Sequence, residues 1–103
     1  MGSKSFIIDL TVGDRIRIRS VTREGEIGSF VVQYEAFLKN EWREILRYDT
    51  SHGFLHLDVC HIKKKSDKIK LDITDLNQAF SYAIQDIKAK WQFYRDRYER
   101  EIK

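Results

Sequence analysis

Apolar and polar residues alternate along most of the first 73 residues of the chain. Alternation puts successive side chains on opposite faces of a strand, so it predicts β-strands with one buried face. The short polar connections between the alternating segments are typical of hairpins. We therefore expect an antiparallel meander of five to six strands within residues 5–73. The segments are residues 6–10 (FIIDL), 15–21 (RIRIRSV), 29–39 (SFVVQYEAFLK), 42–49 (WREILRYD), 54–62 (FLHLDVCHI) and 68–73 (KIKLDI).

The spacing of apolar residues changes to three and four after Thr74, which predicts an amphipathic helix over residues 75–102. Its apolar stripe consists of Leu76, Phe80, Ala83, Ile84, Ile87, Trp91, Tyr94 and Tyr98. Either Thr74 or Asp75 can cap its N-terminus. The prediction is an α+β fold in one domain, residues 1–103: an antiparallel meander covered on one face by a long C-terminal helix.

The register of the central strands can be predicted, because a shift of one residue would move every side chain to the opposite face. A three-residue loop at 39–41 and a four-residue turn at 50–53 align the apolar sets of neighbouring strands. Glu44 is the one polar exception in the inward set of its strand. The expected cross-strand pairs are Leu38 with Trp42, Tyr34 with Leu46, Tyr48 with Leu55, Leu46 with Leu57, and Ile18 with Val32.

The same register predicts which side chains share the outward face of the sheet. Arg47 should lie directly opposite His56, with Asp49 and Asp58 diagonally beside them, within about 8 Å. One row across the sheet should then contain Arg17, Gln33, Arg47 and His56.

A basic stripe occupies this outward face as well. One interpretation is a solvated face with cross-strand ion pairs. The other is a platform whose cations neutralise the phosphates of a nucleic acid. Only Phe37 and Phe54 are outward aromatic candidates, so we expect contact with the backbone more than with bases. The residues expected to bind nucleic acid are Arg15, Arg17, Arg19 and Lys70, and Lys68 lies on the same face.

Composition is that of a globular protein, with 42% hydrophobic residues and a net charge of +3. The mild excess of basic residues permits a nucleic acid or an acidic partner. No apolar run is long enough to span a membrane, and no secretory signal is visible at the N-terminus. A single cysteine, Cys60, excludes an internal disulfide and indicates a buried, inert thiol in a reducing compartment. These features predict a cytoplasmic protein without membrane contact.

The polar segment RYDTSHGFLHLD, residues 47–58, is the candidate catalytic region. Cleavage of RNA without a metal needs a base, an acid and a cation for the phosphorane. His52 and His56 are candidates for the base and acid, Arg47 for the cation, and Asp49 or Asp58 for orienting an imidazole. A straight strand would separate the two histidines by about 13 Å, so only a turn at Gly53 could bring them together.

A metal site is the second possibility for this segment. His52, His56, Asp49 and Asp58 are all legitimate metal ligands. Two histidines four residues apart are adjacent on a helix, however, and not across a turn. The spacing therefore carries little weight, and the sequence predicts neither a metal nor another cofactor.

This segment and the helix sequence AFSYAIQDIKAKWQFYRDRY together resemble a known pattern. Small uncharacterised prokaryotic domains carry R-Y-D…H-G-F-x-H-x-D and a closing helix with Asp-(Leu/Ile)-Lys…Trp…Tyr. The pattern is similar to that of TumE-type toxins of toxin–antitoxin modules, over about residues 30–100. Arg47, Tyr48, Asp49, His52 and His56 match the signature, whereas Asp58 stands where the TumE-type pattern has its second histidine.

The resemblance implies a small toxin-like protein that acts on RNA, either as a metal-independent ribonuclease or as an RNA binder. Its partners would be RNA and a cognate antitoxin protein. The alternative is a non-catalytic protein-binding module, or a structural subunit of a small complex, that docks through the sheet face or the helix.

Helix length predicts a homodimer. Residues 75–102 would extend about 42 Å as a helix, whereas strands of this length reach about 26–34 Å. The end of the helix should then overhang the sheet with an aromatic cluster of Trp91, Phe93, Tyr94 and Tyr98, which a two-fold contact would cover. The alternative is a helix that lies diagonally across the sheet and keeps its aromatic residues within the monomer.

Overall fold

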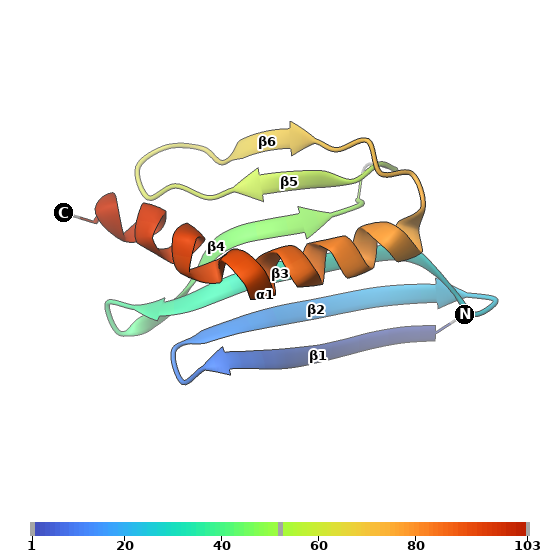
Figure 1. Ribbon diagram of the computed structural model, residues 1–103, viewed down its shortest axis with the longest axis horizontal. Helices are drawn as coiled ribbons and strands as arrows, with labels where there is room; N and C mark the ends of the chain where they lie inside the picture. Colours follow the sequence, from blue (N-terminus) through green and yellow to red (C-terminus); the bar gives the residue numbers. More distant parts are fainter. Residues whose placement is uncertain (1, 52, 103) are drawn as a thin grey trace.

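The computed structural model describes residues 2–51 and 53–102, which form one antiparallel sheet of six strands and one helix (Figure 1). The strands pair in sequence order, so the sheet is a meander, and α1 (Leu76–Arg100) crosses one of its faces. This confirms the predicted α+β fold. The strands are β1 (Gly2–Thr11), β2 (Asp14–Arg23), β3 (Glu26–Leu38), β4 (Glu41–Asp49), β5 (His56–Val59) and β6 (Asp67–Lys70).

The core lies between α1 and the inward face of the sheet. Ala79 and Ala83 are fully buried, and their small side chains allow the helix to approach the strands closely. Full burial of a side chain such as Ile18 or Leu46 stabilises the fold by roughly 1.5–3 kcal/mol. The fully buried apolar residues of the sheet include Ile16, Ile18, Val32, Tyr34, Ile45 and Leu46.

The turn between β3 and β4 differs from the prediction. Lys39 and Asn40 both have positive φ, 55° and 65°, so two residues make the turn in place of the expected three. Trp42 therefore pairs with Phe37 and not with Leu38. The expected Leu38–Trp42 pair is wrong, and Trp42 lies on the face opposite the helix, where it is 37% exposed.

A β-bulge then restores the predicted register. The pairing shifts between Tyr34 and Glu35, so that Ile45 is the extra residue on β4. Beyond it, Tyr34 pairs with Leu46 as expected. The bulge also explains why Glu44 interrupted the inward set: this glutamate belongs to the other face of the sheet.

The pairing of β4 with β5 is displaced by two residues from the prediction. Arg47 pairs with Asp58, and Asp49 pairs with His56, because β5 begins at His56 and not at Phe54, as the expected four-residue turn required. The expected direct pairing of Arg47 with His56 is therefore wrong. A displacement of two keeps every side chain on its predicted face, so these residues still share the outward face.

Both ends of α1 are fixed by specific contacts. The Asp75 carboxylate accepts hydrogen bonds from the backbone N–H groups of Asn77 and Gln78, which confirms one of the two expected caps. At the other end Arg97 donates to the Cys60 carbonyl, and Glu101 accepts from the backbone N–H of Ile62. Figure 1 shows this end of the helix beside the connection between β5 and β6.

The expected exposed aromatic cluster is largely absent. Tyr98 is buried, and Trp91 and Tyr94 are half-buried against the core, while Phe93 is 68% exposed. The last turns of the helix pack against the connection that follows β5, where Arg97 and Glu101 bind Cys60 and Ile62, so this end of the helix is covered within the chain. Dimerisation remains a prediction. Of the four aromatic residues on which it was based, only Phe93 is strongly exposed. Light scattering at micromolar concentration tests it.

Acidification should release the C-terminal end of α1. Burial tends to raise the pKa of Glu101, but His61, the backbone N–H of Ile62 and the Arg97 charge together lower it. A carboxyl group with a lowered pKa stabilises the fold above its unfolded value of about 4.3, and this contribution is lost as pH falls through the folded pKa. Hydrogen-exchange protection of residues 95–102 should therefore drop below about pH 4 relative to β2. Glu101→Gln should show the lower protection already at pH 7, and equal protection of the wild type at pH 3 and pH 7 would contradict this expectation.

Candidate functional site

The face of the sheet opposite α1, which we call the open face, carries two rows of mostly polar side chains. They run perpendicular to the strands, because paired residues of neighbouring strands lie side by side. One row crosses from β1 to β6 as Ile7, Arg17, Gln33, Arg47, Asp58 and Lys68. The next row is Ser5, Arg19, Val31, Asp49, His56 and Lys70. The predicted row of Arg17, Gln33 and Arg47 is thus present, with Asp58 in the place expected for His56.

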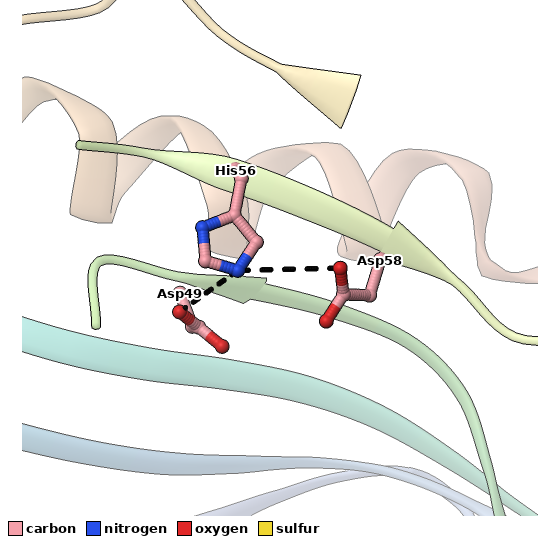
Figure 2. A group of neighbouring side chains, drawn as sticks. All are labelled: Asp49, His56 and Asp58. Atoms are coloured by element: carbon pink, nitrogen blue, oxygen red, sulfur yellow. Dashed lines mark ion pairs between the residues drawn. The ribbon is translucent and has the colours of Figure 1, made fainter. Parts of the chain in front are cut away.

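Asp49, His56 and Asp58 form an acid–histidine cluster on this face (Figure 2). His56 Nε2 lies 3.1 Å from Asp49 Oδ1 and 4.0 Å from Asp58 Oδ1. The three residues are only 5%, 4% and 2% exposed. The Phe54 ring packs against the imidazole at 5.7 Å between centroids. Ionisable groups are rarely buried to this extent unless they are paired, and the contacts among these three side chains supply such pairing.

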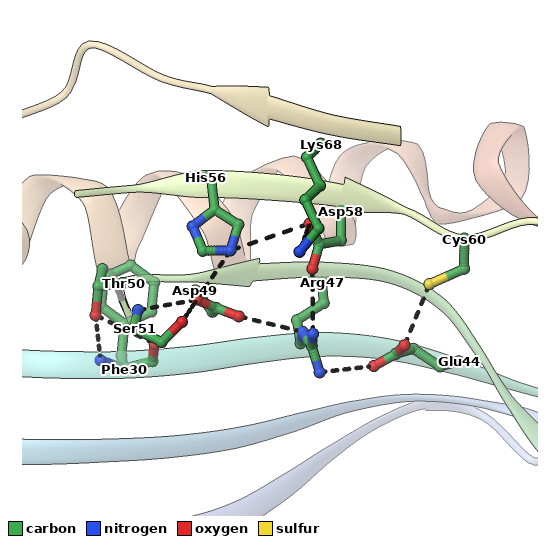
Figure 3. A network of polar contacts seen from close by, with 10 residues as sticks. All are labelled: Phe30, Glu44, Arg47, Asp49, Thr50, Ser51, His56, Asp58, Cys60 and Lys68. Carbon is green, nitrogen blue, oxygen red and sulfur yellow. Dashed lines mark hydrogen bonds and ion pairs between the residues drawn. The ribbon is translucent and has the colours of Figure 1, made fainter. Parts of the chain in front are cut away.

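Arg47 connects the cluster to Glu44 (Figure 3). Its Nη2 donates to Asp58 Oδ2 at 3.1 Å, its Nε lies 3.3 Å from Asp49 Oδ2, and its Nη1 donates to Glu44 Oε1 at 3.4 Å. Desolvation tends to lower the pKa of Arg47, but the three carboxylates outweigh it and raise the pKa. The guanidinium therefore neutralises carboxylates of its own protein.

Ser51 holds Asp49 in place. Its backbone N–H and its hydroxyl both donate to Asp49 Oδ1, at 2.9 and 2.8 Å. Burial tends to raise the pKa of Asp49, but these hydrogen bonds and the nearby His56 and Arg47 lower it overall. Asp49 is therefore ionised at neutral pH, and its oxygens act as acceptors.

Cys60 is not a nucleophile in this arrangement. Its thiol lies 3.2 Å from Glu44 Oε2, and the residue is buried. Burial, together with the carboxylate of Glu44, raises the pKa of the thiol to about 12. Because only the thiolate reacts readily, the inert cysteine expected from the sequence agrees with this environment.

The arginines on β2 differ sharply in their surroundings. Arg15 donates to Glu35 at 2.7 Å and lies over the Trp42 ring at 3.8 Å. Arg17 and Arg19 are exposed, and neither makes an ion pair with any residue that the structure describes. These two arginines therefore carry the available positive charge on this part of the face.

Two adjoining hollows run along the open face beside Arg17 and Arg19. The first, of about 660 Å³, is lined by both arginines, and the second, of about 410 Å³, continues past Arg19 to Thr50 and Ser51. Ser51 is the residue that holds Asp49, so the second hollow ends next to the acid–histidine cluster.

The structure brings together most of the predicted site residues. Of the catalytic candidates, Arg47, Asp49 and His56 are in contact or share a neighbour, while His52 lies outside the described residues. The nucleic-acid candidates Arg15, Arg17, Arg19 and Lys70 all lie on the open face. Sequence reasoning missed the roles of Glu44, Trp42 and Ser51. For Glu44 and Trp42 a signal was available: Glu44 is a polar residue within an apolar inward set, and such an interruption is typical of a β-bulge.

Fold and site together define a small α+β domain with one helix-covered sheet face and one open, charged face. A family model described as a domain of unknown function, DUF7718, matches residues 1–103, and the chain belongs to this family. Neither the curated proteins nor the solved structures include a match to the chain. In the described residues, no helix is both long enough and apolar enough to cross a membrane.

Proposed function

We propose that this protein binds single-stranded RNA along the open face of its sheet, as a small toxin-like protein of the prokaryotic cytoplasm. The observation that carries the proposal is the pair of exposed arginines, Arg17 and Arg19, beside the two hollows. Neither arginine is neutralised by a carboxylate of the described chain. Cations that the fold leaves unpaired can neutralise phosphates without breaking an internal interaction.

Exposed aromatic rings support single-stranded RNA as the ligand. Phe37 and Trp42 form an edge-to-face pair on the open face, and Phe54 lies beside the acid–histidine cluster. Their exposed fractions are between 37% and 43%. Proteins that bind single strands combine a basic groove with rings on which bases stack, and this face offers both.

In this proposal cleavage takes place at the acid–histidine cluster, with His56 as the proton-transfer group and Asp49 as the residue that orients it. Arg47 is a positioning residue, because its donors are directed at three carboxylates. Phosphate contact is assigned to Arg17 and Arg19. The similarity of residues 47–58 to TumE-type toxins adds a cognate antitoxin as the partner that would cover the open face.

A protein-binding module is the second candidate function. The outer edge of β1 is unpaired in the described sheet, and β1 is ten residues long. Unpaired edges of this length readily accept another strand. This function predicts capture of a partner strand without any affinity for RNA.

RNA binding is tested by fluorescence anisotropy with a labelled single-stranded RNA of mixed sequence. We expect binding at low salt that weakens steeply toward physiological salt, with a slope of about −0.7 in log K against log salt for each phosphate contact. Induced expression should arrest growth, and His56→Ala should remove this effect while the far-ultraviolet circular dichroism stays the same. Absence of RNA binding at low salt would reject the RNA function and leave the protein-binding module.

A further inference from the structure

One oxygen of the acid–histidine cluster has no hydrogen-bond donor among the residues that the structure describes. Asp58 Oδ1 is buried, and the whole Asp58 side chain is only 3% exposed. The nitrogen atoms that pair with it, Lys68 Nζ at 3.9 Å and His56 Nε2 at 4.0 Å, are beyond hydrogen-bonding distance. A buried carboxylate oxygen without a donor is costly, so this atom is expected to have another partner.

The surrounding atoms have the chemistry of a metal site. Oxygen and nitrogen atoms from Asp49, His56 and Asp58 lie within 4.8 Å of one another. Metal–ligand bonds of about 2.0–2.2 Å allow two ligands to be at most about 4.4 Å apart. The separations of 3.1 Å and 4.0 Å measured from His56 Nε2 fall below this limit. The two aspartate oxygens are within 4.8 Å of each other, so side-chain rotations are needed to bring all three ligands onto one cation. Figure 2 shows the three side chains directed toward one another.

We propose that Asp49, His56 and Asp58 bind one divalent transition-metal cation. His56 would contribute Nε2, and each aspartate one oxygen. An imidazole ligand beside two carboxylates favours zinc, manganese or iron over magnesium or calcium, which prefer oxygen ligands alone. With a metal bound, His56 Nε2 is a ligand and cannot transfer a proton, so this assignment would replace the metal-free proton transfer at His56 described under the proposed function.

The outer contacts of the site agree with this assignment. Arg47 donates to Asp58 Oδ2 and lies 3.3 Å from Asp49 Oδ2, so it orients both carboxylates through the oxygens that the metal would not use. Ser51 holds the same carboxylate with two hydrogen bonds to Asp49 Oδ1, and a cation bound at that oxygen would replace one of them. Outer partners of this kind orient the ligands of natural metal sites.

Three protein ligands would leave coordination positions for water or for a phosphate oxygen. The second hollow on the open face reaches Ser51, next to these ligands, which gives such a molecule a path to the cation. The metal site does not depend on the RNA proposal, since it can be measured without any nucleic acid.

The test uses the full chain, freed of metal with a chelator and titrated with cobalt(II). We expect visible absorption bands that saturate at one equivalent, and zinc should displace the cobalt. Asp58→Asn and His56→Gln should each weaken binding by more than the roughly 10–100-fold that loss of an outer partner costs. His61→Gln is the matched control, because His61 also lies between two carboxylates, those of Asp67 and Glu101, and should bind cobalt like the wild type.

Copper(II) bound to the wild type provides a measurement that needs no variant. Its electron paramagnetic resonance spectrum should show hyperfine coupling to a single imidazole nitrogen. Lack of saturable cobalt binding at millimolar concentration would overturn the proposal, and so would binding that only His61→Gln abolishes. In either case the cluster is an internal ion-pair network.

Discussion

Replacing Arg47 with methionine should lower the free energy of unfolding by about 2–3 kcal/mol. The substitution keeps most of the side-chain volume but removes the cation shared by Glu44, Asp49 and Asp58. Breaking a fully buried ion pair costs roughly 3–5 kcal/mol. We expect less here, because the Arg47 side chain is 34% exposed and water screens part of the lost interaction.

Urea unfolding at pH 7, followed by circular dichroism, measures this loss. Arg17→Met is the matched control, since Arg17 stands in the same row of the open face without an ion pair among the described residues. The control should change stability by less than about 0.5 kcal/mol, as is usual for a surface position. Equal stability of the two variants would show that Arg47 is not the internal counter-ion that its contacts indicate.

Reversing the charges of Arg17 and Arg19 should abolish RNA binding at physiological salt. The double variant Arg17→Glu/Arg19→Glu replaces two exposed cations beside the hollows with anions that repel phosphates. The milder Arg17→Ala/Arg19→Ala should retain weak binding. Its slope of log K against log salt should be about 1.4 shallower than that of the wild type, which corresponds to two lost contacts with a single strand.

Anisotropy with the same labelled RNA measures both variants. Lys88→Glu/Arg100→Glu makes the same change in net charge at two exposed positions of α1, and it should bind nearly as the wild type does. If this control lost as much affinity as the β2 variant, binding would follow the total charge of the protein and not the open face. If neither variant lost affinity for RNA, the RNA site would lie elsewhere on the protein.

Much of the candidate site could be predicted from the sequence, because side chains alternate along a strand. The alternation at Arg15, Arg17 and Arg19 was enough to put all three on one face. The β4–β5 register was wrong by two residues, and an even displacement leaves every face unchanged. For this reason the prediction that Arg47 and His56 share a face was right, although their direct pairing was wrong.

Positions near turns could not be predicted in the same way. The two-residue turn at Lys39 and Asn40 requires positive φ at both residues. Neither residue is glycine, which is the usual sequence signal for such a turn. The bulge at Ile45 adds one residue to β4, so the residues before it lie on the face opposite to the one expected. Trp42 therefore reached the open face, against the prediction.

The sequence by itself determined the order and type of the elements and the face on which most strand residues lie, since these depend on local periodicity. It also limited the helix cap to Thr74 or Asp75, because a cap depends on local hydrogen bonds. The tertiary structure alone decided which charges are used internally. Arg15 and Arg47 are neutralised by carboxylates from other strands, whereas Arg17 and Arg19 are left exposed. It also decided the burial of Asp58 and the docking of the last helical turn, because both depend on distances between segments far apart in the chain.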